Sequence, residues 1–190
     1  MHELIAGVDE AGRGPLAGPV TAAAVILPNN HAISGLADSK KISVKKREAL
    51  AGIIKQTALS YAVCFISQEE IDRINILEAS LKAMAQAIAK LSLRPHTVLV
   101  DGNKTPTVQG IRVQAIIKGD SKIDSISAAA ILAKVARDER MLEFDKFYPE
   151  YGFARHKGYG TKEHIAALAR HGVCPIHRKS FAPVRKILDL

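Results

Sequence analysis

The sequence contains few cysteines and no segment typical of a secreted or membrane protein. Its two cysteines, Cys64 and Cys174, lie far apart and form no Cys-x-x-Cys pair, which argues against a disulfide framework and a zinc knuckle. We expect both to be buried as small apolar side chains. The N-terminus has no basic segment followed by an apolar one, and no apolar run is long enough to span a bilayer. These absences predict a soluble, cytoplasmic protein without a membrane partner.

Several motifs of phosphate and hydrolase chemistry are also absent. The glycines near the N-terminus, Gly12, Gly14 and Gly18, are spaced G-x-G-x-x-x-G rather than in the dinucleotide-binding pattern G-x-G-x-x-G. No G-x-x-x-x-G-K-S/T, G-x-S-x-G or H-E-x-x-H pattern occurs in the chain. The sequence therefore does not support a Rossmann site, a P-loop, a serine-hydrolase elbow or a zinc-protease helix.

The composition is that of a globular protein with an excess of positive charge. An apolar content of 47% in 190 residues predicts one domain, which buries roughly 70% of the surface of its unfolded chain. The net charge is +8, and residues 151–190 alone hold eight Lys/Arg against two Asp/Glu. We therefore expect residues 1–190 to form a single domain with a basic C-terminal extension over about 151–190. This concentration of charge favours a polyanion partner over a merely solvated surface.

Hydrophobic periodicity predicts an α/β protein. Strands are expected in the apolar runs that begin at residue 5 and that span residues 20–27, 60–67, 97–100 and 111–117. Helices are expected over residues 43–57, after the capping box Ser67 and Glu70, after Asn75, and over about 125–145. A tight Gly/Pro-rich turn joins the first two strands, which predicts an antiparallel pair. In the helix after Asn75, a core-facing stripe is expected from Leu77, Leu81, Met84, Ala85, Ile88 and Leu91.

Three of the apolar strands end in carboxylates: Asp9 and Glu10, then Asp101, then Asp120. Each acid alone has an ordinary interpretation, because Asp101 could form a turn, Asp120 could begin a helix, and Asp9 or Glu10 could pair with Arg13. Four acids at three strand ends are harder to explain in a basic protein, since clustered carboxylates repel each other. Mg²⁺ or Mn²⁺ would relieve that repulsion, and two such ions about 4 Å apart can hold the reacting oxygens of a phosphodiester. The pattern predicts a metal-dependent nuclease.

Two further points qualify this interpretation. Neighbours in an extended strand point to opposite faces, so Asp9 and Glu10 can serve one site only if the strand is ending or a ligand straddles it. A phosphoacceptor receiver domain also has an acidic pair after its first strand, but receivers are shorter and do not need a basic tail. Four histidines of the tail are expected at the surface or on phosphates rather than on zinc: His156, His164, His171 and His177.

The chain resembles the ribonuclease HII family. The resemblance rests on seven motifs in the family's order: DEAGRGPLAGPV from Asp9, DSKK from Asp38, VDGN from Val100, KGDS from Lys118, ISAAAILAKVARD from Ile126, HKGYGT from His156 and HRKSF from His177. It implies a ribonuclease H-like fold, which is a mixed five-stranded sheet flanked by helices, with a helical C-terminal extension. It also implies endonucleolytic cleavage of RNA in RNA–DNA hybrids and beside single ribonucleotides in duplex DNA.

The resemblance also implies roles for individual residues. The family's metal ligands for Mg²⁺ or Mn²⁺ fall on Asp9, Glu10, Asp101 and Asp120. Ser39 and Lys40 match residues that contact the substrate backbone. Gly12, Arg13 and Gly14 match a loop whose main chain senses the 2′-hydroxyl, and Tyr159 matches a tyrosine that packs on the next deoxynucleotide. Phosphate contacts that weaken with salt are expected from Lys40, Lys157, Arg178 and Lys179.

The chain departs from the family pattern at one position. Many members have a second serine in the helix after the third acidic strand end, that of Asp120, where this sequence has Ala130, while Ser127 is retained. Ribonuclease HIII is the nearest related family, but it carries a further N-terminal domain and a different glycine loop. We expect a monomer. The alternative from another class is a non-enzymatic nucleic-acid binding protein whose acids only cap helices and form turns.

Overall fold

The computed structural model describes residues 3–36 and 42–189 and contains one mixed five-stranded sheet of order β3-β2-β1-β4-β5. The strands are β1 (Ile5–Ala11), β2 (Val20–Ile26), β3 (Ser60–Ile66), β4 (Thr97–Asp101) and β5 (Arg112–Ile116). The pairs β1–β2 and β2–β3 are antiparallel, whereas β1–β4 and β4–β5 are parallel. The predicted five strands and the antiparallel first pair are confirmed.

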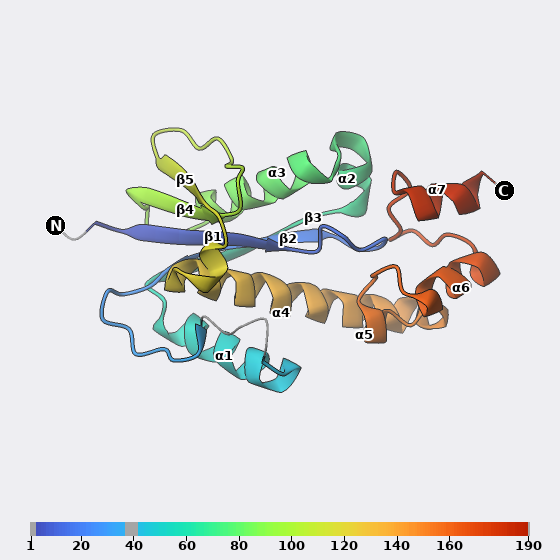
Figure 1. Ribbon diagram of the computed structural model, residues 1–190, viewed down its shortest axis with the longest axis horizontal. Helices are drawn as coiled ribbons and strands as arrows, with labels where there is room; N and C mark the ends of the chain where they lie inside the picture. Colours follow the sequence, from blue (N-terminus) through green and yellow to red (C-terminus); the bar gives the residue numbers. More distant parts are fainter. Residues whose placement is uncertain (1–2, 37–41, 190) are drawn as a thin grey trace.

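Helices cover both faces of the sheet (Figure 1). On one face lie α2 (Gln68–Ile74) and α3 (Ile76–Ala89), and on the other lie α1 (Val44–Thr57) and the long α4 (Asp124–Phe147). The predicted caps are present, because the side chains of Ser43, Ser67 and Asn75 accept hydrogen bonds from the first turns of α1, α2 and α3. No helix in the described part of the chain is long and apolar enough to cross a membrane.

The predicted apolar stripe of α3 is only partly right. Of its six residues, Met84 and Ile88 are fully buried, and Leu81 and Leu91 pack at the border of the core. The rest of the buried face is made by the small residues Ala79, Ser80, Ala83 and Ala87. Alanines let a helix lie close to the sheet, so the larger leucines are moved to the edges of the contact.

The first strand also packs very closely against α4. A Cβ atom added to Gly7 would lie 2.1 Å from the carbonyl carbon of Ser125, at the start of that helix. Only glycine allows this approach of strand to helix. The contact holds the beginning of α4, and the short helix η2 (Gly119–Ser121) before it, against the centre of the sheet.

The molecule is elongated, and the C-terminal extension forms the end opposite to the N-terminus (Figure 1). It consists of η3 (Pro149–Tyr151), α5 (Phe153–His156), α6 (Lys162–His171) and α7 (Ala182–Leu188). Its apolar core includes Leu16 and Ala17, from the loop between β1 and β2, and Met141 of α4. The extension therefore packs directly against the segment that follows Asp9 and Glu10. Cys174 is buried in this core, and Cys64, on β3, is buried in the core between the sheet and α3, as expected.

Candidate active site

The end of the parallel pairing between β1 and β4 brings two of the predicted acids together. The parallel register stops at Val8 and Val100, so Asp9 and Asp101 follow side by side. Beyond Val8, β1 continues to Ala11 and pairs with β2 alone. Glu10 therefore lies where one edge of its strand is open. The expected condition, that the strand ends here, is therefore met only in part: β1 itself continues, but its pairing with β4 has ended before Asp9 and Glu10.

The third strand end is joined to the second by hydrogen bonds. One oxygen of Asp101, Oδ1, accepts from the backbone N–H of Gly119 at 2.7 Å and of Asp120 at 3.3 Å. Ser127 Oγ donates to the carbonyls of Asp120 and Ile123. The retained serine of α4 thus fixes the backbone of the fourth acid.

The electrostatics of Asp9 show that the four acids share one field. Burial raises the pKa of Asp9 well above its usual range, and the charges of Glu10, Asp101 and Asp120 raise it further. Burial also raises the pKa of Glu10, although Arg13 Nη1, 3.4 Å from Glu10 Oε1, acts in the opposite direction. A buried carboxylate surrounded by other carboxylates is an unfavourable arrangement that a cation would stabilise.

The chemistry of these side chains fits a hard divalent cation, although they do not form a closed cage. In residues 3–36 and 42–189, no three Asp, Glu, His or Cys side chains are arranged to hold a metal ion. Two of the carboxylates are turned toward the backbone, because Asp9 Oδ1 accepts from Glu10 N at 2.7 Å and Asp101 Oδ1 accepts from Gly119 N. The donor set contains only carboxylate oxygens, which Mg²⁺ and Mn²⁺ prefer. The second oxygen of each of these carboxylates can ligate an ion while Oδ1 keeps its backbone hydrogen bond.

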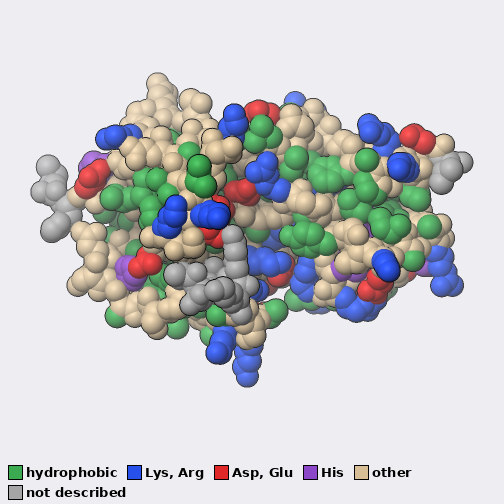
Figure 2. All heavy atoms as spheres, in the orientation of Figure 1, with side chains coloured by type: hydrophobic (Ala, Val, Ile, Leu, Met, Phe, Trp, Pro, Cys, Tyr) green, Lys and Arg blue, Asp and Glu red, His purple; other side chains and the backbone are tan. Residues whose placement is uncertain are grey.

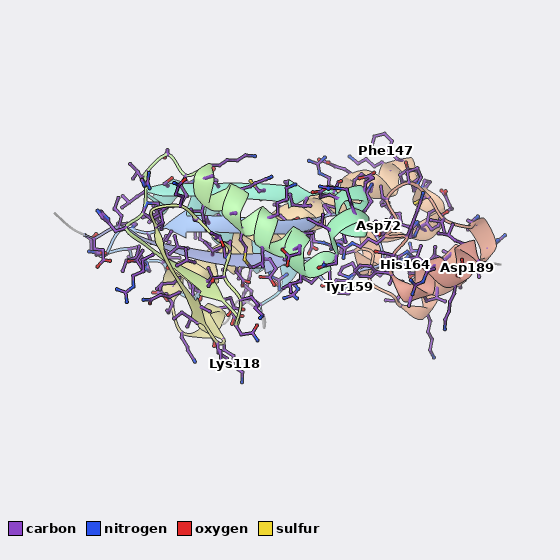
Figure 3. All side chains as sticks on the ribbon, turned by 90° about the horizontal axis from the view of Figure 1, so that it is seen from above. Asp72, Lys118, Phe147, Tyr159, His164 and Asp189 are labelled. Carbon is purple, nitrogen blue, oxygen red and sulfur yellow. The ribbon has the colours of Figure 1, made fainter. Side chains whose placement is uncertain are left out.

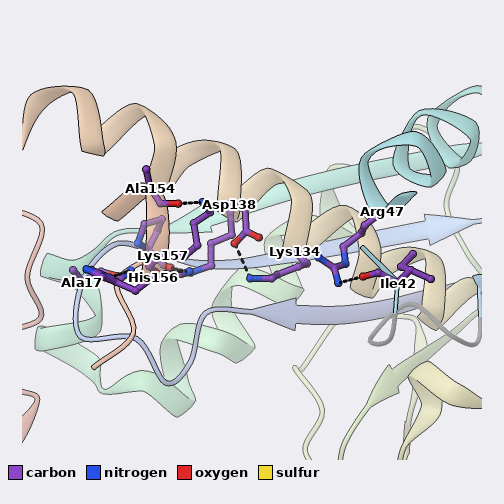
Figure 4. A network of polar contacts seen from close by, with 11 residues as sticks. Ala17, Ile42, Arg47, Lys134, Asp138, Ala154, His156 and Lys157 are labelled. Carbon is purple, nitrogen blue, oxygen red and sulfur yellow. Dashed lines mark hydrogen bonds and ion pairs between the residues drawn. The ribbon is translucent and has the colours of Figure 1, made fainter. Parts of the chain in front are cut away.

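A cavity of about 330 Å³ lies beside the acids. It is lined by Asp9, Glu10, Ala11, Gly12, Arg47, Ala130, Ile131, Lys134 and Tyr159. The basic members come from α4, where Lys134 Nζ lies 2.7 Å from Asp138 Oδ1, and from α1, where Arg47 donates to the carbonyl of Ile42 (Figure 4). In the middle of the face shown in Figure 2, Asp or Glu side chains are likewise flanked by Lys and Arg. The surroundings therefore suit a negatively charged substrate.

Lys134 and Arg47 were missed by the sequence analysis. Lys134 follows Ala130 by four residues on α4, so it lies on the same helix face, and that spacing is the signal that could have identified it. A larger cavity, of about 620 Å³, opens beside the start of β1 and the carbonyl end of β2 and is lined by none of the four acids. Proximity to the acids, rather than size, defines the candidate site.

The remaining predicted residues surround the same cavity or lie outside the described residues. Gly12 has φ +94° and lines the cavity. A Cβ atom on Gly14 would lie 3.7 Å from the ring of Tyr159, and Figure 3 shows Tyr159 between the sheet and the extension. The side chain of Arg13 is half exposed. Ser39 and Lys40 fall outside the described ranges.

Arg178 does not contact phosphates, which corrects the expectation from its sequence. It is 0% exposed, and its guanidinium donates to the carbonyls of Gly12, Arg13 and Gly18. Burial lowers its pKa to about 9, which leaves it charged at neutral pH. Lys157 is partly buried and its Nζ donates to the carbonyl of Ala154, whereas Lys179 is exposed as expected.

Three of the four tail histidines are buried, so their predicted surface position is wrong. His164 and His177 are 0% and 1% exposed, and their Nε2 atoms lie 3.0 Å apart. His164 Nδ1 faces the carbonyl of Tyr159 at 2.9 Å and must donate to it, while His177 Nδ1 accepts from the N–H of Cys174 at 3.0 Å. These two contacts assign one neutral tautomer to each ring. His164 carries its proton on Nδ1, and His177 carries its proton on Nε2, which donates to His164 Nε2.

Burial and the repulsion between neighbouring histidines disfavour the charged form of this pair. Burial lowers the pKa of His164. Burial also lowers the pKa of His177, to about 4, and the neighbouring His164 acts in the same direction. The third buried ring, His156, stacks on His164 with centroids 4.6 Å apart. Only His171 is exposed. Buried polar groups of this kind were invisible to composition, because the sequence HRKS reads as a basic surface segment.

The fold and the acidic strand ends together define the class of protein, which is an α/β protein with the ribonuclease H-like fold. Its structure is similar to the ribonuclease H2 from Pyrococcus horikoshii OT3, with a TM-score of 0.82 and 28% identity, covering 98% of this chain and 97% of that one. It is also similar to Bst-RNase HIII in complex with Mn²⁺, with a TM-score of 0.72, but 20% identity over 98% of this chain and 70% of that one shows the fold alone.

The sequence comparisons identify the family. A family model described as Ribonuclease HII matches residues 6–184. A ribonuclease HII from Albidiferax ferrireducens is 57% identical over 185 residues, which cover 97% of this chain and 89% of the relative. The chain therefore belongs to the ribonuclease HII family, whose members are type 2 ribonuclease H endonucleases.

Proposed function

We propose that the protein is a metal-dependent endonuclease that cleaves the RNA strand of RNA–DNA hybrids and the phosphodiester beside single ribonucleotides in duplex DNA. The products would carry 5′-phosphate and 3′-hydroxyl ends. Family membership supports the ribonuclease activity. The observation that carries the metal dependence is the buried Asp9, whose pKa is raised by burial and by three neighbouring acids. A group in this position is stabilised as a carboxylate when a cation is bound.

Asp9, Glu10, Asp101 and Asp120 would hold Mg²⁺ or Mn²⁺, two ions at a time. Bound ions supply an activated water and neutralise the charge on the leaving 3′-oxygen. The chain itself keeps the acids in reach, because hydrogen bonds join Asp101 to the segment that carries Asp120. These bonds hold the two acids together before an ion binds.

Substrate contacts are proposed for the residues around the cavity. The main chain of Gly12, Arg13 and Gly14 would approach the ribonucleotide sugar, which an absence of side chains allows at the glycines. Tyr159 is 43% exposed and would pack on a neighbouring nucleotide, while Ser39 and Lys40 would contact the backbone. We further propose that the protein acts as a monomer in the cytoplasm.

A cleavage assay tests this proposal. A DNA duplex with one ribonucleotide is incubated with Mg²⁺, with Mn²⁺, and with excess chelator, using the wild type, Asp9→Asn and the matched control Asp189→Asn. Asp189 is an exposed aspartate in the extension, on the side away from the sheet and from Tyr159 (Figure 3). We expect a metal-dependent nick from the wild type and the control, and a rate at least about 100-fold lower for Asp9→Asn, because ligand loss removes several kcal/mol of transition-state stabilisation.

Two outcomes would contradict the proposal. Normal turnover by Asp9→Asn would show that Asp9 holds no essential ion. Binding of the duplex without any nick, in either metal, would favour the alternative of a non-enzymatic nucleic-acid binding protein.

A further inference from the structure

Arg178 connects the C-terminal extension to the glycine loop of the candidate site. Its Nη2 donates to the carbonyl of Gly12 at 2.6 Å, its Nη1 to the carbonyl of Arg13 at 2.9 Å, and its Nε to the carbonyl of Gly18 at 2.9 Å. Every nitrogen of the guanidinium is thus bonded to the backbone of one loop.

The backbone around Arg178 is itself fixed. Its N–H donates to the carbonyl of Leu16 at 2.8 Å. The next two N–H groups, of Lys179 and Ser180, donate to the carboxylate of Asp72 on α2, each at 2.9 Å. The guanidinium is therefore presented to the loop from a rigid support.

Burying an arginine lowers the stability of a fold, because its charge loses hydration. Arg178 is 0% exposed and forms no ion pair within residues 3–36 and 42–189, so its charge is stabilised by carbonyl dipoles, by the ring of Phe181 and by the charge of Asp72 beyond ion-pair distance. An apolar side chain of similar volume would avoid that cost. What arginine offers is a planar fork that fixes two neighbouring carbonyls in a set direction.

Fixing these carbonyls also sets the direction of two N–H groups. The peptide bonds are trans, so the C=O and N–H of one peptide unit point in opposite directions. When the carbonyls of Gly12 and Arg13 point inward to Arg178, the N–H groups of Arg13 and Gly14 point away from it. Neither N–H donates to an atom of the described chain. Two successive N–H groups that point the same way can bind one oxygen atom between them.

These two N–H groups belong to the loop beside the candidate site. Gly12 lines the cavity that contains Asp9 and Glu10, and Gly14 lies against the ring of Tyr159. We propose that Arg178 is a positioning residue that aims the N–H groups of Arg13 and Gly14 at one oxygen of the nucleic-acid substrate beside the scissile bond. The proposal rests on the proposed function. The oxygen belongs either to a backbone phosphate or to the 2′-hydroxyl of the ribonucleotide, which share the same acceptor chemistry.

Binding measurements on matched duplexes test this role. Dissociation constants are measured in chelator for four duplexes: one with a single ribonucleotide, one with deoxyribose there, one with 2′-fluoro there, and one with the ribonucleotide and an adjacent methylphosphonate. In the wild type, removing the contacted oxygen should weaken binding. Arg178→Lys keeps the charge but loses the fork, and should reduce that preference by about threefold to tenfold, the usual effect of a hydrogen bond.

The pattern of loss distinguishes the two sources of the oxygen. A preference that falls for the deoxyribose and 2′-fluoro duplexes assigns the 2′-hydroxyl, and one that falls for the methylphosphonate assigns the phosphate. Arg155→Lys, at an exposed arginine paired with Glu163, is the control and should keep the wild-type preferences. If Arg178→Lys weakens binding to all four duplexes equally, or if the wild type shows no preference in either comparison, the positioning role is wrong.

A second measurement does not depend on how well the variant folds. In the wild type, the amide proton resonances of Arg13 and Gly14 should move downfield when the ribonucleotide duplex is added, and unchanged resonances would overturn the proposal. Its failure remains distinct from failure of the proposed function, because the cleavage assay with Asp9→Asn tests the acids and not the loop.

Discussion

The C-terminal extension should be destabilised by mild acid through one histidine. His177 is 1% exposed, and both ring nitrogens are committed: Nδ1 accepts from Cys174 N–H at 3.0 Å, and Nε2 lies 3.0 Å from Nε2 of His164. Protonation of His177 would turn Nδ1 into a donor, which would lose the N–H of Cys174 and keep only the carbonyl of Cys174, at 3.3 Å, as an acceptor. Protonation of His164 would place two N–H groups against each other. Either event breaks a buried hydrogen bond.

The sign and size of the effect follow from the pKa of His177. Its folded value is lowered to about 4, from an ordinary 6.5. The unfolded chain therefore takes up a proton first, so the contribution is fully present above pH 6.5 and is lost as the pH falls toward 4. At about 1.4 kcal/mol per unit of pKa, the loss is about 3 kcal/mol at the acid limit and about 2 kcal/mol at pH 5.

Urea unfolding at pH 7.5 and pH 5 measures this contribution in the wild type, in His177→Gln and in the control His171→Gln. The wild type and the control should lose about 2 kcal/mol more between the two pH values than His177→Gln does. Asp9 and Glu10 have raised pKa values and act in the opposite direction, but they are present in all three proteins and cancel. An identical pH dependence for wild type and His177→Gln would refute the reasoning.

Three further substitutions test the packing and charge of the site. Gly12→Ala places a Cβ atom 2.0 Å from Arg137 Nε, at a residue with φ +94°. The substitution should lower the free energy of unfolding in urea by about 1–3 kcal/mol and lower kcat/KM at least about tenfold. Unchanged kinetics would contradict the proposed role of the loop. Gly7→Ala places a Cβ atom 2.1 Å from the Ser125 carbonyl carbon and should lower the free energy of unfolding by about 3 kcal/mol. A urea midpoint equal to that of the wild type would contradict this expectation. Lys134→Met should make the slope of log affinity against log salt shallower by about 0.9, measured by fluorescence anisotropy; an unchanged slope would show that Lys134 contacts no phosphate.

The sheet and the four acids were predictable because their signals are local. Each strand is a short apolar run, and the predicted ends differ from the observed ones by one residue for β2, β3, β4 and β5. Carboxylates directly after such runs are placed at or near strand ends by the chain itself, but the side-by-side position of Asp9 and Asp101 depends on the pairing of β1 with β4. What the sequence could not give is the orientation of their oxygens, which depends on backbone N–H groups such as that of Gly119.

The buried cations and histidines were not predictable for the opposite reason. Arg178 and His177 lie in a basic segment whose sequence alone suggests exposure to solvent. Arg178 is buried instead because it binds the carbonyls of Gly12 and Arg13, more than 100 positions away in the chain. A local pattern contains no information about those acceptors. The same limit applies to Lys134, whose place at the cavity depends on how α4 packs under the sheet.

Two adjacent residues of the extension therefore support two different parts of the site. His177 acts through His164 on the carbonyl of Tyr159, and Arg178 acts on the loop of Gly12 and Arg13. The four acids, in contrast, are held by the sheet and by η2. Acid that opens the histidine pair should consequently disturb the groups that place the substrate before it disturbs the acids that would bind the metal. As the pH falls toward the folded pKa of His177, about 4, this order predicts that KM rises while the folded sheet persists.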